Sequence, residues 1–120
     1  MIIKKESEDQ FQKACVTWFE KQYPQYYYLL HHSPNGGKRN AAEGAKFKAM
    51  GTRAGFPDLS LYIAKGGFHG LFIELKIKKN KQQPAQINMQ KELEAQGYKY
   101  VLCNNFDLFI ETINNYLKYS

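Results

Sequence analysis

The chain has 120 residues, a length typical of one folded domain with its own hydrophobic core. Nine Tyr, eight Phe and one Trp exclude a disordered polypeptide, and no apolar run is long enough for a membrane-spanning helix. A formal net charge of +6 favours a polyanionic partner. Charges begin at once at the N-terminus, and Cys15 and Cys103 lie in apolar segments without metal-ligand spacing. We therefore expect no signal peptide, two buried free thiols and a cytoplasmic location.

The first predicted element is a helix from about Glu8 to Gln22. Ser7 and Gln10 have the spacing of a capping box. Apolar residues recur at helical spacing: Phe11, Ala14, Cys15, Trp18 and Phe19. Glu8 borders this apolar stripe. It could serve a site as an outer contact, although spacing alone favours a simple interaction with the helix dipole.

A strand is expected next, over residues 26–31, on β propensity. Its tyrosines are predicted as core residues, with base stacking as the less favoured alternative. His31 and His32 lack further ligands at zinc spacing. After a glycine-containing loop, Asn40 is expected to cap a short helix that ends near Met50.

Two basic clusters flank the middle of the chain, one before residue 55 and the other from Lys76 onward. The first contains Lys38, Arg39, Lys46, Lys48 and Arg53, opposed only by Glu43, and the second contains Lys76, Lys78, Lys79 and Lys81. We expect nucleic-acid phosphates to contact the first cluster together with Lys78. A solvated basic face is the alternative for the second cluster.

The central stretch, residues 55–76, predicts a β-hairpin. Two apolar runs, residues 59–63 and 72–76, are separated by the turn signal Gly66-Gly67. Side chains alternate across a strand, so Glu74 and Lys76 share one face and the apolar residues between them occupy the other. If the hairpin pairs Asp58 near Glu74, two carboxylates and one ammonium converge.

Such a cluster can hold a divalent metal. Mg²⁺ or Mn²⁺ takes one or two carboxylates, here Asp58 and Glu74, with waters and substrate phosphate as the remaining ligands. Lys76 can orient the attacking water or stabilise developing negative charge, and phosphodiester hydrolysis is the natural reaction. The alternative is an ordinary Pro-Asp turn followed by an exposed Glu-Lys pair on a solvated strand.

The remaining elements are a helix, a strand and a final helix. Pro84 begins the helix, which ends at Gly97 and directs Gln86, Met89, Gln90 and Leu93 inward. Gln86 bonds either the metal site or a phosphate, or it is a boundary residue bonded to backbone. Residues 98–103 form the last strand, and Asn104 or Asn105 caps the final helix. This order predicts one α/β domain over residues 1–120, with a mixed central sheet flanked by helices on both faces.

The motifs resemble the PD-(D/E)XK nuclease signature: Pro57-Asp58, then Glu74-Leu75-Lys76 sixteen residues after Asp58. Glu8 and Gln86 make the chain most similar to the virus-type replication-repair nuclease (VRR-NUC) domain. The resemblance implies a restriction-endonuclease-like core and a homodimeric, phage-type DNA endonuclease similar to Holliday junction resolvases. Asp58 and Glu74 would bind Mg²⁺ or Mn²⁺, Lys76 would be the catalytic lysine, and Gln86 and Glu8 would be supporting site residues.

Two alternatives remain open at this stage. The same residues would serve a nuclease acting on ordinary duplex or flap DNA, or on RNA. The second alternative is a non-catalytic nucleic-acid-binding module, but such a binder has no need to hold two carboxylates that repel phosphate.

Overall fold

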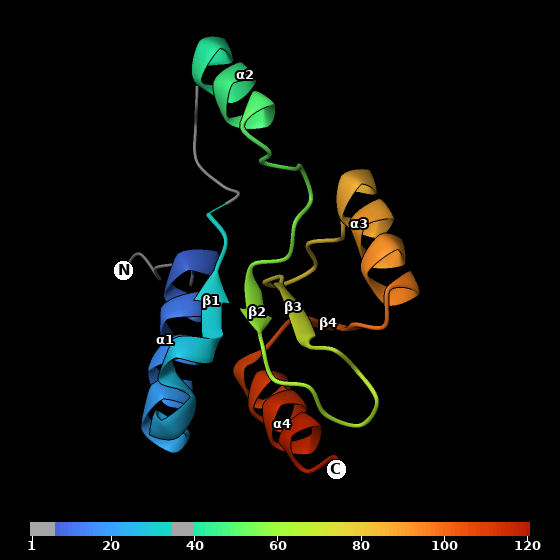
Figure 1. The fold of residues 1–120 in the computed structure, drawn as a ribbon. Helices are drawn as coiled ribbons and strands as arrows, with labels where there is room; N and C mark the ends of the chain where they lie inside the picture. The colour runs from blue at the N-terminus through green and yellow to red at the C-terminus, as the bar shows by residue number, and fades with distance from the viewer. Residues whose placement is uncertain (1–6, 35–39) are drawn as a thin grey trace, which may run out of the picture.

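The computed structural model describes residues 7–34 and 40–120 (Figure 1). Its elements, in chain order, are α1 (Glu8–Gln22), the 3₁₀ helix η1 (Pro24–Leu29), β1 (Leu30–His32), α2 (Ala41–Ala49), β2 (Leu59–Leu61), β3 (Leu71–Leu75), α3 (Pro84–Ala95), β4 (Lys99–Cys103) and α4 (Phe106–Leu117).

The four strands form one mixed sheet in the order β1-β2-β3-β4. The first three pair antiparallel, whereas β4 lies parallel to β3 because α3 connects them as a crossover. The predicted hairpin is confirmed: β2 and β3 pair with Leu59 opposite Ile73, and a bridge from Lys65 to Phe68 closes the turn.

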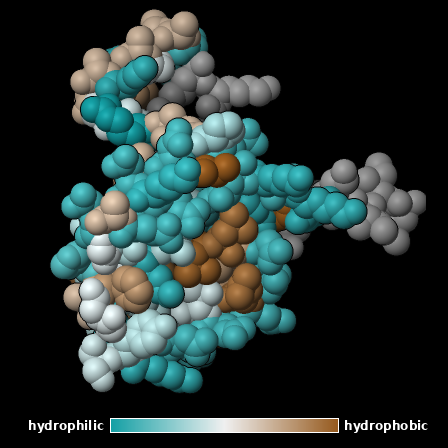
Figure 2. Space-filling model, turned by 90° about the vertical axis from the view of Figure 1, so that its right-hand side faces the viewer, coloured by the Kyte–Doolittle hydropathy of each residue, from teal (hydrophilic) through white to brown (hydrophobic). Residues whose placement is uncertain are grey.

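Helices cover both faces of the sheet, as predicted. On one face α1 and α4 enclose the main core, where buried side chains include Phe19, Ile73 and Phe109. On the other face α3 packs beside β4, and its inner residues are only half-buried. Figure 2 shows that apolar side chains remain visible on the α3 side, inside a hydrophilic rim. The second face is therefore the less completely covered one.

The strand predicted over residues 26–31 is wrong for most of its length. Pro24 opens the 3₁₀ helix at its first turn, and strand geometry begins only at Leu30, which pairs with Leu61 of β2. Strand propensity depends on a pairing partner, and residues 26–28 pair with no strand in the described sheet. The predicted core role also fails for Tyr27 and Tyr28, whose side chains are 53% and 92% exposed.

The four predicted helices are confirmed as α1, α2, α3 and α4. Ser7 and Gln10 form the capping box of α1, and the Asn40 side chain accepts a hydrogen bond from the Glu43 backbone at the start of α2. Asn105, rather than Asn104, caps α4. Cys15 and Cys103 are both buried, as predicted. No helix in the described part of the chain is long and apolar enough to cross a membrane.

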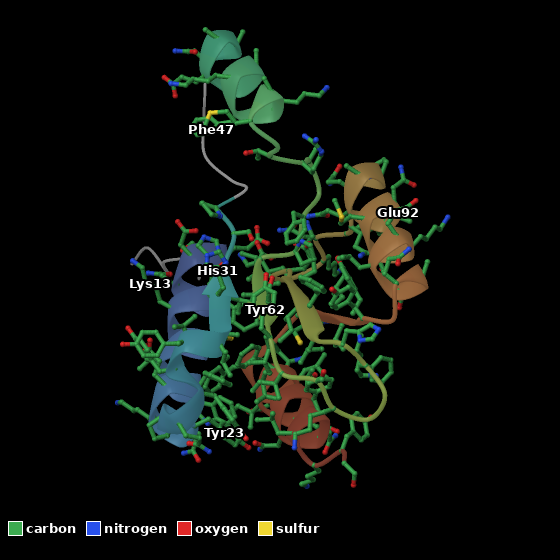
Figure 3. The ribbon with its side chains drawn as sticks, in the orientation of Figure 1. Lys13, Tyr23, His31, Phe47, Tyr62 and Glu92 are labelled. Carbon is green, nitrogen blue, oxygen red and sulfur yellow. The ribbon has the colours of Figure 1, made fainter. Side chains whose placement is uncertain are left out.

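Helix α2 projects from the body of the molecule (Figures 1 and 3). None of its residues is buried, and Phe47 and Met50 at its end are 36% and 71% exposed. The segment that follows α2 leads directly into Pro57 and Asp58 at the start of β2. A helix with exposed lysines therefore projects from the molecule, and in the sequence it comes just before the hairpin of β2 and β3.

Candidate active site

Asp58 stands immediately before β2, one residue beyond the pair formed by Leu59 and Ile73, so it comes opposite Glu74. Its Oδ2 accepts a hydrogen bond of 2.7 Å from the Leu75 backbone N–H. Its carbonyl oxygen accepts from the Ser33 backbone at 3.1 Å and from His32 Nδ1 at 2.9 Å. Both the backbone and the carboxylate of Asp58 are thus fixed to neighbouring strands.

Glu74 lies in the middle of the sheet, and only 2% of its surface is exposed. Gln86 Nε2 donates to its Oε2 at 3.1 Å, and the Tyr100 hydroxyl donates to its Oε1 at 3.3 Å. Burial raises the pKa of the Glu74 carboxyl to about 8. Asp58 adds to the rise through a hydrogen bond and charge repulsion, whereas Lys76 and Tyr100 oppose it.

Lys76 follows β3 and is also buried, with 8% of its surface exposed. Its backbone N–H donates to the Cys103 carbonyl at 3.0 Å, which continues the pairing with β4 beyond the strand end. Its ammonium lowers the pKa of both Glu74 and Glu8, so its positive charge acts on both carboxyls. The alternative of an exposed Glu-Lys pair on a solvated strand is therefore wrong.

Glu8 approaches the same place from the first turn of α1. Partial burial raises the pKa of its carboxyl, Lys76 lowers it and the Asp58 carboxylate raises it further. Gln86 comes from the first turn of α3. Its Oε1 accepts a 2.7 Å hydrogen bond from the Gln83 backbone N–H, which leaves its NH₂ group directed at Glu74. Gln86 thus combines the two predicted alternatives, a backbone bond and a site bond.

Gly55 allows the loop before Asp58 to press against the start of α3. Its φ is +78°, and a Cβ built on it would lie 2.4 Å from the carbonyl carbon of Ala85 and 2.7 Å from the backbone nitrogen of Gln86. Only glycine tolerates both this conformation and this approach. The contact brings the Asp58 loop and Gln86 to the same side of the sheet.

These groups line one cavity of about 270 Å³. Its lining residues are Glu8, Gly55, Phe56, Asp58, Glu74, Lys76, Gln83, Ala85 and Gln86. All five predicted site residues are among them. A neighbouring cavity of about 300 Å³ shares Glu8 and Asp58, and a third, of about 360 Å³ beside α2, shares Phe56.

The predicted nucleic-acid contacts are spread more widely. Arg53 lines the cavity beside α2, and its Nη1 donates to two backbone carbonyls, those of Lys48 and Thr52. Lys46 and Lys48 are exposed on α2 itself. Lys78 lines a separate cavity of about 170 Å³. The predicted contacts Lys38 and Arg39 lie outside the described residues.

Tyr100 and Gln82 are hydrogen-bonded to the site through Glu74, and sequence reasoning missed both. Tyr100 lies on β4, is 7% exposed and hydrogen-bonds both Glu74 and Gln82. Burial, followed by the charge of Glu74, raises the pKa of Tyr100 above its usual value, so its hydroxyl keeps its proton. Alternation on the last predicted strand places Tyr100 and Val101 on opposite faces of the sheet. The sequence pattern does not show which of these two faces carries Glu74.

The donor set fits a hard divalent cation. Three carboxylates line the cavity, those of Glu8, Asp58 and Glu74. Burial, and after it the neighbouring Asp58 carboxylate, raises the pKa of Glu74, and a bound cation would favour the charged form of this carboxyl. Within residues 7–34 and 40–120, no three His, Cys, Asp or Glu side chains cluster as a metal-binding group. Waters and phosphate would therefore complete the coordination, as is usual for Mg²⁺ and unlike a structural zinc site.

A mixed sheet with helices on both faces is an α/β architecture of the restriction-endonuclease-like type. A sequence profile of the VRR-NUC domain matches residues 6–107, and the chain belongs to the VRR-NUC family. A solved structure described as a VRR_NUC domain protein is 36% identical and superposes with a TM-score of 0.85. That match covers 98% of this chain and 93% of the other. No curated protein matches the chain.

Proposed function

We propose that this VRR-NUC chain is a divalent-metal-dependent endonuclease that hydrolyses DNA phosphodiester bonds. The observation that carries the proposal is the convergence of Asp58, Glu74 and Lys76 in one cavity, with Glu74 and Lys76 both buried. A protein that only binds DNA would lose affinity by holding two carboxylates beside phosphate. The whole of residues 1–120 is proposed to act as one nuclease domain.

Asp58 and Glu74 would hold Mg²⁺ or Mn²⁺, which when bound supplies Lewis-acid stabilisation of phosphate charge and a more acidic water. The Lys76 ammonium would orient the attacking water and offset negative charge on the phosphate. Gln86 holds Glu74 through its Nε2, and Glu8 at the cavity wall would accept a hydrogen bond from water. Each residue thus has a separate task at the same phosphate.

The basic surface would bind the DNA backbone. Lys46 and Lys48 are exposed on the projecting helix, and Arg53 lines a cavity that shares Phe56 with the site. Lys78 is exposed just beyond β3. Phosphate contacts of this kind position DNA without reading sequence. We propose that the shape of the DNA, such as a branch, selects the substrate.

A homodimer would place two such sites on one DNA junction. The exposed apolar surface beside β1 supports this part of the proposal. Tyr27, Tyr28 and Leu29 are exposed, and the Tyr62 backbone N–H donates to the Leu29 carbonyl at 2.9 Å, which places Tyr62 in the same region. Figure 3 labels Tyr62 beside β1 and His31. β1 also ends the sheet, so its outer edge is open among the described strands.

Cleavage assays test the proposal directly. Linear duplex, flap, splayed-arm and four-way-junction DNA would be incubated with Mg²⁺, with Mn²⁺ or with a chelator. Asp58→Asn, Glu74→Gln and Lys76→Ala should each abolish cleavage while DNA affinity is retained, because the lost groups act on metal and transition state. Glu111→Gln, which removes an exposed carboxylate on α4, is the matched control and should stay active. Unchanged cleavage by Glu74→Gln, or cleavage in chelator, would refute the assignment.

A further inference from the structure

Glu74 is held at both carboxylate oxygens, by donors from two different elements. Gln86 on α3 reaches Oε2 at 3.1 Å, and Tyr100 on β4 reaches Oε1 at 3.3 Å. One donor would leave the carboxylate free to rotate about its last torsion, which is a soft one. Two donors, one on each oxygen, fix the plane of the carboxylate.

The direction of the Tyr100 hydrogen bond follows from its other partner. Gln82 Nε2, which can only donate, lies 3.2 Å from the Tyr100 hydroxyl oxygen and 3.0 Å from Gln90 Oε1. The two hydrogens of the Gln82 amide are therefore used on these two acceptors. Tyr100 accepts from Gln82, so its single hydrogen is left for Glu74.

The chain of bonds continues outward along α3. Gln90 Nε2 lies 3.5 Å from Glu94 Oε2, which makes Gln90 an acceptor toward Gln82 and a donor toward Glu94. The orientation of every amide in the chain is thus set by its neighbour. The chain begins at the exposed Glu94 and ends at the Glu74 carboxylate.

We propose that Tyr100 is a positioning residue, which donates to Glu74 Oε1 and, with Gln86, presets the carboxylate for a divalent cation. Within the described part of the chain, Tyr100 is not among the residues that line the site cavity, so it would act through Glu74 and not on the phosphate. This inference rests on the proposed function for its biological meaning. Its test does not, because metal binding can be measured without DNA.

Tyr100→Phe removes only the hydroxyl, and Tyr116→Phe is the matched control. Tyr116 is a second buried tyrosine whose hydroxyl donates to the Ile63 carbonyl at 2.6 Å, in the core formed with α4. Tyr100→Phe loses the bonds to Glu74 and Gln82, and Tyr116→Phe loses the bond to the Ile63 carbonyl, so both variants should be less stable than the wild type. Only Tyr100→Phe should bind Mn²⁺ more weakly, by about 10-fold, as is typical when a partner of a metal ligand is removed.

Isothermal titration calorimetry with Mn²⁺ on the DNA-free protein measures this difference, and urea unfolding of each metal-free variant measures stability. A 10-fold loss of Mn²⁺ affinity in Tyr100→Phe, with Tyr116→Phe like the wild type, supports the proposal. Equal Mn²⁺ affinity in all three proteins would overturn it, as would equal losses in both variants. If the wild type binds Mn²⁺ but cleaves no DNA, the nuclease assignment fails while the positioning role stands.

Discussion

The most direct consequence of the buried acid at position 74 is an unusual dependence of stability on pH. The pKa of Glu74 is about 8 in the folded protein, against an ordinary value of 4.5. Between these values the folded state binds more protons than the unfolded state, so the free energy of unfolding must fall as pH rises. The stabilisation is complete below about pH 4.5 and is lost as pH passes through about 8.

The expected size follows from one proton. The slope is at most about 1.4 kcal/mol per pH unit, because that is the free energy of one pKa unit. Because the neighbouring charges of Asp58 and Lys76 act on the Glu74 carboxyl, the measured loss from about pH 5.5 to about pH 8 should be about 2 kcal/mol, less than the full slope would give. In a domain of this size each 1 kcal/mol lowers the melting temperature by about 4 °C.

Urea unfolding in chelator, at constant ionic strength, measures this slope. The groups that act on Glu74 are Asp58, Lys76 and Tyr100. Glu74→Gln retains these neighbours and carries no titratable group at position 74, so subtracting its slope from that of the wild type isolates the contribution of Glu74. Glu74→Gln should be nearly flat over the same range. Equal slopes in both proteins would refute the reasoning.

Adding Mg²⁺ or Mn²⁺ extends the test. A cation competes with the proton for the carboxylates, so its stabilising effect should increase as pH rises. The shift in melting temperature caused by metal should therefore be larger at about pH 8 than at about pH 6. A metal-induced shift of the same size in Glu74→Gln would show that the cation binds elsewhere.

Three further predictions concern DNA affinity, backbone conformation and assembly. Changing both Lys46 and Lys48 to Ala should reduce the slope of log binding constant against log salt by about one unit for each lysine–phosphate interaction removed. Fluorescence anisotropy with labelled DNA measures this slope, and an unchanged slope would place α2 away from DNA. Gly55→Ala should destabilise the protein by about 1–3 kcal/mol in urea unfolding, because its Cβ would meet the α3 backbone, and Gly44→Ala, with open space around it, is the control. In analytical ultracentrifugation the protein should sediment as a dimer, and Tyr28→Glu should shift it toward monomer if the surface beside β1 is the interface.

Much of the site could be predicted because its signals are local. Alternation on a strand separates Glu74 from Ile73 and Leu75, and the Gly66-Gly67 turn signal pairs the two runs that carry Asp58 and Glu74. Helix boundaries at Ser7 and Asn40 followed from side-chain caps, which need only the next three residues. The caps and the strand alternation depend on residues close in the sequence, and the hairpin depends on one turn between consecutive strands.

The features that were missed depend on distant partners. Tyr26–Tyr28 have the composition of a strand, but the pairing that decides it starts at Leu30, opposite Leu61. The parallel register of β3 and β4 places Tyr100 beside Phe72. Phe72 and Glu74 are two residues apart on β3 and share one face, so Tyr100 can reach Glu74. Nothing in the local pattern of residues 98–103 specifies that register. Lys76 likewise shares its cavity with Glu8 of α1 and Gln86 of α3, the first far from it in the sequence and the second across a loop.

The projecting helix α2 has a consequence for local opening. A helix of nine residues is marginal in water without packing, and none of the residues 41–49 is buried. Its backbone amides should therefore exchange with deuterium much faster than those of β3, every residue of which is buried. The lysines of α2 would therefore lie on a helix that can unfold locally while the sheet and its core stay folded. Ordering of this segment on DNA would then appear as a gain of amide protection confined to α2, with β3 unchanged.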